Sequence, residues 1–169
     1  MIVALRFLAL MLTSLVLGLA FCHVLEMPGK MKLGGHEYMM VQQIYKTFGP
    51  AASVLEPGAI VVSAVLAFLV RRRWPAFALT LGAAVALAAA LGVWGALVYP
   101  VNQRWAELPP GALPPDWQVL RARWEYGHVV HAVLLLLGFA ALVTSVLVDT
   151  VPWRATGRSV RDDGVRRVA

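Results

Sequence analysis

The sequence predicts an all-α integral membrane protein in which four transmembrane helices form a bundle, with an interfacial amphipathic helix between the first and second spans. Of its 169 residues, 60% are hydrophobic and only 14% are charged, and the mean hydropathy is +0.72. A soluble domain has about 25% charged residues. Four apolar runs are each long enough to cross about 30 Å of hydrocarbon at about 1.5 Å per residue.

The predicted spans cover residues 3–25, 51–70, 76–99 and 128–149 within one domain of residues 1–150. Apolar residues recur at helical spacing over about 36–48, which predicts the interfacial helix. A helix beginning near Asp116 as its N-cap is expected to continue into the fourth span. Residues 151–169 are polar and basic, a composition typical of a disordered tail.

A cleaved signal peptide is the competing interpretation of the first apolar run. Its single charge, Arg6, lies six residues in, and the apolar stretch exceeds a usual signal-peptide core. We therefore expect the run to be retained as a transmembrane helix.

The net charge of +6 reflects arginines beside the predicted membrane ends, at Arg71–Arg73 and in the tail. This placement indicates membrane orientation and argues against nucleic-acid binding. With four spans, both groups fall on the same side as the N-terminus, and the positive-inside rule makes that side cytoplasmic. The sequence thus predicts a multi-pass protein of the cell inner membrane, with both termini in the cytoplasm.

Two histidine–glutamate pairs mark the outer ends of the first and fourth spans. His23 and Glu26 form an H-x-x-E pair, and Glu125 and His128 form the reversed E-x-x-H pair. Residues at i and i+3 share a helix face. Since the spans alternate in direction, both pairs fall at the same membrane surface.

Two further polar residues lie deeper below that surface. His131 follows His128 by one turn, and Glu56 lies about 9 Å below the surface at about 1.5 Å per residue. A carboxylate inside a span indicates a functional site by default. Six side chains from three helices are expected to converge: His23, Glu26, Glu56, Glu125, His128 and His131.

This set allows three interpretations. Carboxylates with i, i+3 Glu/His pairs inside a four-helix bundle resemble the ligands of di-iron proteins, and imidazole with carboxylate suits Fe, Cu, Zn or Mn. The same residues could instead form a metal-free pocket for proton transfer or substrate binding. In the third interpretation they are structural, with Glu125 paired to Arg121 or Arg123 and Glu26 paired to Lys30.

Candidate substrate-binding residues lie in the two outer connections. They are Trp105, Trp117, Trp124, Gln42 and Tyr45. Tryptophan and tyrosine also form belts at membrane interfaces, which is the alternative role of these aromatic residues. The sequence contains no P-loop, nucleotide-binding fingerprint, Cys-x-x-Cys pair or nucleophile elbow.

Two outer segments resemble a known family. YPVNQRW (99–105) and DWQVLRARWEYGH (116–128) are similar to the Pro-x-Asn and Trp-x-x-x-His signature of a small four-span family of unknown function that includes the anthrone oxygenases. HVLEMPGKMKL followed by VQQIYKTFG is similar to one bacterial branch. The resemblance covers most of residues 15–145 and matches Asn102, Trp124 and His128. Many members have an arginine three residues after that histidine, where this chain has His131.

The resemblance implies a membrane four-helix unit and, for some members, insertion of O2 into an activated aromatic carbon without a bound redox cofactor. We therefore expect oxidation of an apolar aromatic or quinol-like substrate that enters from the lipid bilayer. His128 would be the base, Glu125 or Glu56 would orient it, and Asn102 would hold the developing oxyanion. The alternative is a non-catalytic membrane subunit or a His/Glu metal-binding four-helix module.

Overall fold

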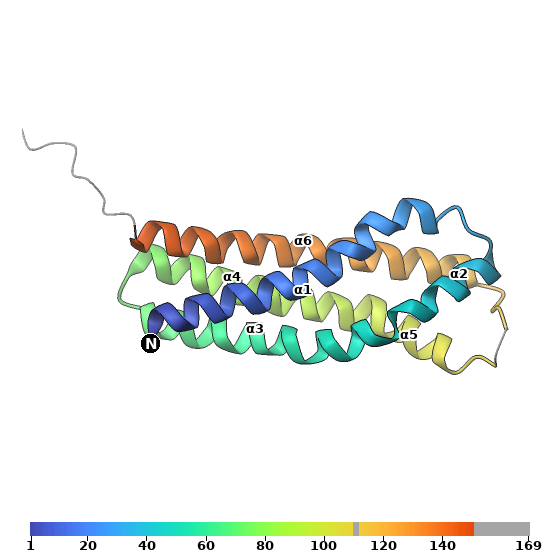
Figure 1. Cartoon of the computed structure of the whole chain (residues 1–169), viewed down its shortest axis with the longest axis horizontal. Helices are drawn as coiled ribbons and strands as arrows, with labels where there is room; N and C mark the ends of the chain where they lie inside the picture. Colours follow the sequence, from blue (N-terminus) through green and yellow to red (C-terminus); the bar gives the residue numbers. More distant parts are fainter. Residues whose placement is uncertain (110–111, 151–169) are drawn as a thin grey trace, which may run out of the picture.

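The computed structural model describes residues 1–109 and 112–150 and shows a bundle of long helices (Figure 1). Four helices in these ranges are long and apolar enough to cross a membrane, which confirms the predicted all-α four-span architecture. No strand occurs in the part of the chain that is described. The predicted disordered tail, 151–169, lies outside the described residues.

The spans are longer than the apolar runs that predicted them. The first two are α1 (Ile2–Lys30) and α3 (Phe48–Val70); the third joins α4 (Trp74–Val93), the π-helical segment η2 (Trp94–Val98) and α5 (Tyr99–Ala106); the fourth is α6 (Trp117–Thr150). An apolar run ends at the first cluster of polar residues, whereas helical hydrogen bonding continues through them. The helix expected to follow Asp116 does begin there and reaches into the fourth span.

The predicted interfacial segment is helical, but in two pieces. The helix α2 (Gly35–Val41) is followed by the 3₁₀ helix η1 (Gln42–Thr47), where a single helix over 36–48 was expected. A 3₁₀ turn is a common connector between helices of different direction. It lets the chain pass from α2, at the end of the bundle, into α3 while Tyr38 and Tyr45 both face inward.

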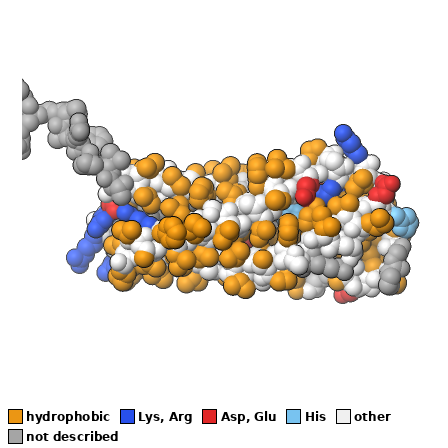
Figure 2. All heavy atoms as spheres, viewed as in Figure 1, with side chains coloured by type: hydrophobic (Ala, Val, Ile, Leu, Met, Phe, Trp, Pro, Cys, Tyr) orange, Lys and Arg blue, Asp and Glu red, His pale blue; other side chains and the backbone are white. Residues whose placement is uncertain are grey.

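The bundle has two ends of different construction. The N-terminal end carries the start of α1, the turn between α3 and α4, and the end of α6, whereas α2, η1 and α5 lie at the other end, which we call the cavity end (Figure 1). Toward the cavity end, α1 and α3 diverge (Figure 1). Hydrophobic side chains cover the length of the bundle, and charged side chains gather near its two ends (Figure 2). This surface suits a lipid bilayer.

Small residues pack the N-terminal half of the bundle closely. Ala9, Ala76 and Ala83 are buried against Leu66 and Leu142, so the backbones of the four spans can approach one another. A second core, in the middle of the bundle, joins all four spans through Val16, Ala59, Leu87, Ala90 and Leu135. At the cavity end the buried core consists of larger side chains, those of Tyr45, Val98, Val101, Leu120 and Trp124.

Ion pairs tie the helices together at the N-terminal end. Arg6 of α1 and Arg73, the residue before α4, both contact the carboxylate of Asp149 in α6. Arg73 Nη1 lies 2.7 Å from Asp149 Oδ2. This contact holds the start of α1, the start of α4 and the end of α6 in register.

Candidate functional site

The diverging helices at the cavity end enclose a cavity of about 860 Å³. This volume is within the range of small-molecule sites. Its wall combines aliphatic side chains with the aromatic rings of Phe48, Trp94, Trp105 and Trp124. The polar side chains in this wall that could bind a ligand or transfer a proton are those of His23, Gln42, Glu56, Asn102, His128 and His131.

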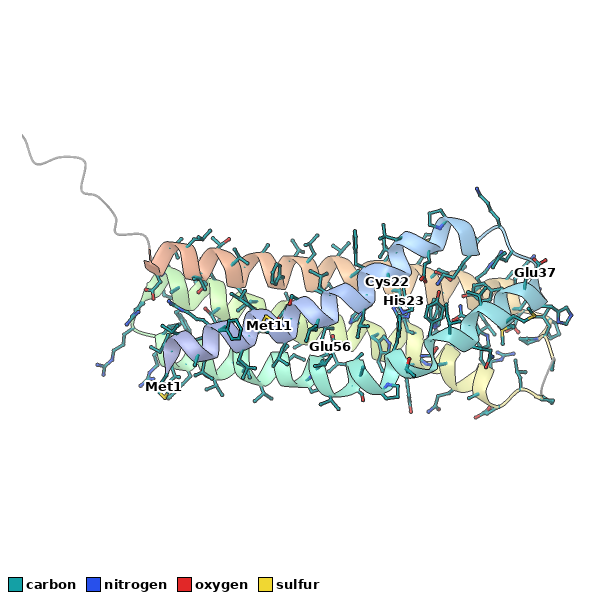
Figure 3. All side chains as sticks on the ribbon, in the orientation of Figure 1. Met1, Met11, Cys22, His23, Glu37 and Glu56 are labelled. Carbon is teal, nitrogen blue, oxygen red and sulfur yellow. The ribbon has the colours of Figure 1, made fainter. Side chains whose placement is uncertain are left out.

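The deepest polar contact in the cavity wall joins α3 to α6. The Nε2 atom of His131 lies 3.0 Å from Glu56 Oε1 and 3.2 Å from Glu56 Oε2. Glu56 is only 3% exposed and His131 only 4%. Figure 3 labels Glu56 nearer the middle of the bundle than His23, with Glu37 at the cavity end. The Glu56–His131 pair therefore lies at the bottom of the cavity.

A cluster of aromatic and imidazole rings lies nearer the cavity end than the Glu56–His131 pair. The ring of His128 has its centroid 4.2 Å from that of His23 and 4.2 Å from that of Trp124. His23 in turn lies 4.6 Å from the ring of Tyr45. The Nδ1 atoms of both histidines are buried without a hydrogen-bond partner in the described part of the chain. These imidazoles are held by ring contacts and are not committed to a carboxylate.

A second group of polar side chains surrounds Lys30 beside the cavity. Lys30 Nζ lies 3.1 Å from Glu125 Oε1, 3.9 Å from Glu26 Oε2 and 4.5 Å from the centre of the Trp124 ring. Lys30 is 4% exposed and Glu125 is 1% exposed. A buried ammonium group is expensive unless it is paired, and here two carboxylates and an aromatic face compensate it.

Two tyrosines attach α2 and η1 to this group. The Tyr38 hydroxyl donates to Glu125 Oε1 at 2.9 Å, and the Tyr45 hydroxyl donates to Glu26. Burial, together with the adjacent carboxylate, raises the pKa of each tyrosine well above its usual value. Both hydroxyls therefore stay protonated and remain donors. We call Glu26, Lys30, Tyr38, Tyr45 and Glu125 the Lys30 cluster.

The expected single site of six residues is thus divided into two. His23, Glu56, His128 and His131 line the cavity, whereas Glu26 and Glu125 belong to the Lys30 cluster. Among the described residues, no three His, Cys, Asp or Glu side chains are arranged to hold a metal ion. The possible Fe, Cu, Zn or Mn site therefore gains no support from the described residues, and the Lys30 ammonium group lies between Glu26 and Glu125.

The structure contradicts the interpretation in which Glu125 pairs with Arg121 or Arg123, because its partner is Lys30. Arg121 Nη1 donates to the Leu33 carbonyl at 3.0 Å, and Arg123 Nη2 donates to the Ala96 carbonyl at 2.7 Å. The expected proximity of Glu26 and Lys30 is found. Glu125 contacts Lys30 and Tyr38 and is not part of the cavity wall, so its role in orienting His128 stays a prediction.

Glu56 takes an unexpected partner as well. It was expected to orient His128, but it contacts His131, one turn deeper on α6. No carboxylate of the described residues forms a hydrogen bond with His128. His128 and His131 therefore have different chemical settings in the structure.

Most of the predicted substrate-binding residues do line the cavity. Trp105, Trp124, Gln42 and Tyr45 are in its wall, and so is Asn102. Trp117 is the exception, because its ring lies 4.7 Å from the Arg121 guanidinium group, away from the wall. Arg121 also covers the Tyr38 ring, so Trp117 supports the outer side of the Lys30 cluster.

Three residues were missed by sequence reasoning. Lys30 was expected only as a partner of Glu26, although it follows His23 by seven residues and so lies on the same helix face. Tyr38 had no sequence feature to distinguish it from an interfacial aromatic residue. Trp94 was not among the predicted substrate-binding residues, yet it lines the cavity.

Comparison of the chain with family models, with curated proteins and with solved structures found no match. The functional argument therefore rests on the cavity and its residues.

Proposed function

We propose that the chain is a membrane oxidoreductase of the anthrone-oxygenase-like class, which oxidises a planar, lipid-soluble aromatic substrate in the cavity. The observation that carries this proposal is the joint lining of one large cavity by aromatic rings and by three imidazoles. An apolar wall with a few convergent polar groups is typical of a small-molecule site. The cavity lies among the membrane-spanning helices, which suits a lipid-soluble substrate.

The chemistry needs a base and O2. For an anthrone, removal of a proton from the ring methylene leaves a carbanion that the ring carbonyl stabilises. O2 then adds to that carbon, and loss of water gives the quinone. One oxygen atom becomes the new carbonyl oxygen and the other leaves in the water with both methylene hydrogens. Carbon is oxidised, and O2 is the oxidant that accepts its electrons.

His128 is the residue that we assign as the base. A general base must be in its neutral form and within reach of the proton it removes. His128 lines the cavity and has no carboxylate at hydrogen-bond distance among the described residues, whereas His131 is bound to Glu56. The Glu56–His131 pair is suited to receive a proton below the substrate.

The test is an oxygen-electrode and absorbance screen of anthrones and quinols with detergent-purified protein. Wild type is expected to consume O2 with at least one member of the set. His128→Ala should lower turnover by about 10²–10⁴-fold, the usual contribution of a general base. His36→Ala is the matched control, because His36 is an exposed histidine outside the cavity wall. Full turnover by His128→Ala would overturn the assignment.

A non-catalytic membrane subunit is the second candidate function. The Lys30 cluster favours it, because its ion pairs and hydrogen bonds join α1, α2, η1 and α6. The two candidates make different predictions for the cavity. A purely structural protein would bind no aromatic ligand, and filling its cavity by Ala20→Phe would then stabilise it without loss of any binding.

We also propose that the N-terminal end faces the cytoplasm and that the membrane is the cell inner membrane. Arg6 and Arg73 lie at that end, beside Arg71 and Arg72, as the positive-inside rule requires. The cavity end then faces outward. A reporter fused after Ala169 should behave as cytoplasmic, and one inserted between α5 and α6 as external. Exchanged results would refute the orientation.

A further inference from the structure

Hydroxyl groups are buried in the bundle between the bottom of the cavity and the N-terminal end. The four spans, α1, α3, α4 and α6, each carry one buried serine or threonine among the described residues. Polar side chains are costly inside a membrane, and where they face the interior of a bundle they often mark a pathway for ions or protons. None of the four is more than 2% exposed: Thr13, Ser63, Thr80 and Ser145.

These hydroxyls continue the direction of the Glu56–His131 pair toward the N-terminal end. Ser63 follows Glu56 by seven residues on α3, and Ser145 follows His131 by fourteen residues on α6. A spacing of seven returns to nearly the same helix face after about two turns. At about 1.5 Å per residue, Ser63 lies about 10 Å beyond the pair and Ser145 about 21 Å beyond it. The buried polar groups are therefore arranged in successive layers.

Thr13 and Ser63 form the first layer beyond the cavity. On α1, Thr13 lies between Ala9, in the core of the N-terminal half, and Val16, in the core of the middle, and Ser63 has the matching position on α3. Neither hydroxyl has a hydrogen-bond partner in the part of the chain that is described. A buried hydroxyl without a partner does not stabilise the fold, so its presence needs another explanation.

Thr80 and Ser145 form the second layer, and Asp149 follows it. The two hydroxyl oxygens lie 2.7 Å apart, and Asp149 is one turn farther along α6. The side chain of Asp149 is 12% exposed, and it contacts Arg6 and Arg73. A guanidinium group keeps its protons and opposes the passage of other cations. Asp149 is therefore the group at this end that can take up a proton and release it to water.

At the other end, the layers begin in a cavity that opens at the protein surface. Gln43 and Asn102 are exposed, polar and part of the cavity wall, so water can enter. At the bottom of the cavity, His131 Nε2 contacts Glu56, whereas its Nδ1 atom has no partner among the described residues. An imidazole can accept a proton at one nitrogen and release the proton of the other. The pair can thus receive a proton from cavity water and pass it on.

We propose that the chain conducts protons across the membrane along these buried polar groups. A proton from cavity water binds to the Glu56–His131 pair, passes through the two hydroxyl layers, and leaves to water from Asp149. Each hydroxyl oxygen accepts one proton and releases its own, so nothing is oxidised or reduced. Steps of about 10 Å exceed the length of a hydrogen bond, so water must enter between the layers during transfer. The driving force is the proton gradient or the membrane potential.

Proton flux into proteoliposomes tests this proposal. The full chain would be reconstituted into vesicles that contain a pH-sensitive dye, and a potassium gradient with valinomycin would impose an inside-negative potential. The interior of vesicles with wild-type protein is expected to acidify faster than that of protein-free vesicles. Equal rates in the two kinds of vesicle would overturn the proposal.

A double substitution interrupts the first hydroxyl layer. Thr13→Val with Ser63→Ala removes both hydroxyls and should reduce the flux to that of protein-free vesicles. The matched control is Thr144→Val with Ser14→Ala, because each of these hydroxyls donates to a carbonyl of its own helix and Thr144 is exposed. The control should keep the wild-type flux. Wild-type flux in the first variant, or loss of flux in the control, would overturn the route.

A second variant keeps the test decisive if the first does not fold. Glu56→Gln keeps a side-chain oxygen that can contact His131 but removes the group that ionises, so it should also reduce the flux to that of protein-free vesicles. Wild-type flux with Glu56→Gln would overturn the route. No substrate is present, so the result is independent of the proposed oxidation. Flux without turnover would leave the proton pathway standing, and turnover without flux would leave the oxidation standing.

Discussion

The two ends of the bundle use similar ion pairs between α1 and α6 but differ in how deeply they bury them. At the N-terminal end, Arg6 contacts Asp149, and at the cavity end Lys30 contacts Glu125. The Asp149 side chain is 12% exposed and has Arg73 as a second partner, whereas the Glu125 side chain is fully buried. The Arg6–Asp149 pair therefore lies nearer the surface of the bundle, whereas the Lys30–Glu125 pair lies in its interior.

The N-terminal half and the cavity end also differ in the size of the side chains that pack between the helices. Alanines allow the spans to close on one another in the N-terminal half, and the hydroxyls of Thr80 and Ser145 satisfy each other there. At the cavity end, imidazole and indole rings occupy the equivalent inward positions, and the helices diverge around them (Figure 1). The cavity is therefore a consequence of which side chains face inward in each half.

The largest expected effect comes from breaking the buried pair. Lys30→Met should lower the free energy of unfolding by about 3–5 kcal/mol, because it leaves Glu125 buried without its cation. Arg6→Met should cost clearly less, since Asp149 keeps Arg73 and is nearer to solvent. Thermal and denaturant unfolding in detergent would measure both variants.

A double substitution controls for the loss of the lysine side chain itself. Lys30→Met combined with Glu125→Gln removes the buried charge while keeping an acceptor for Tyr38, and it should recover most of the lost stability. If the double variant were no more stable than Lys30→Met, the pairing would not explain the cost. Equal losses for Lys30→Met and Arg6→Met would remove the difference between the two ends.

The next largest effect is the expected difference between substitutions of His131 and His128 at the cavity end. His131→Ala should cost about 1.5–3 kcal/mol of stability, because it removes a hydrogen bond to a buried carboxylate. His128→Ala should cost less stability and lose more turnover, since the His128 Nδ1 atom has no hydrogen-bond partner among the described residues. Paired measurements of unfolding and O2 consumption would test this. Equal, purely destabilising effects would mean that both histidines are structural.

The sequence was sufficient for the four spans and for the buried positions of His23, Glu56, Glu125, His128 and His131. Apolar run length predicted four spans, and i, i+3 spacing placed Glu125 and His128 on one face. The partners of these residues could not be predicted, because they depend on distances between helices. Glu125 pairs with Lys30 where Arg121 or Arg123 was expected. Glu56 contacts His131 where His128 was expected. The sequence did not predict the π-helical segment η2 either, which packs closely against Gly127 of α6.

The smallest expected effect concerns hydroxyl groups in the spans. Thr13 and Ser63 are fully buried, and their hydroxyls have no hydrogen-bond partner among the described residues. Thr80 is equally buried, but its hydroxyl lies 2.7 Å from that of Ser145. Removing an unpaired buried polar group can be neutral or stabilising, whereas removing one partner of a buried pair costs about 1 kcal/mol.

Thr13→Val should therefore leave the unfolding temperature unchanged or raise it, and Thr80→Val should lower it. The two substitutions exchange the same hydroxyl for a methyl group of similar shape, so each is the control for the other. Unfolding would be followed in the same detergent at the same protein concentration. A larger loss for Thr13→Val than for Thr80→Val would mean that the Thr13 hydroxyl binds a buried water between α1 and α3, and that both halves of the bundle depend on polar contacts inside the membrane.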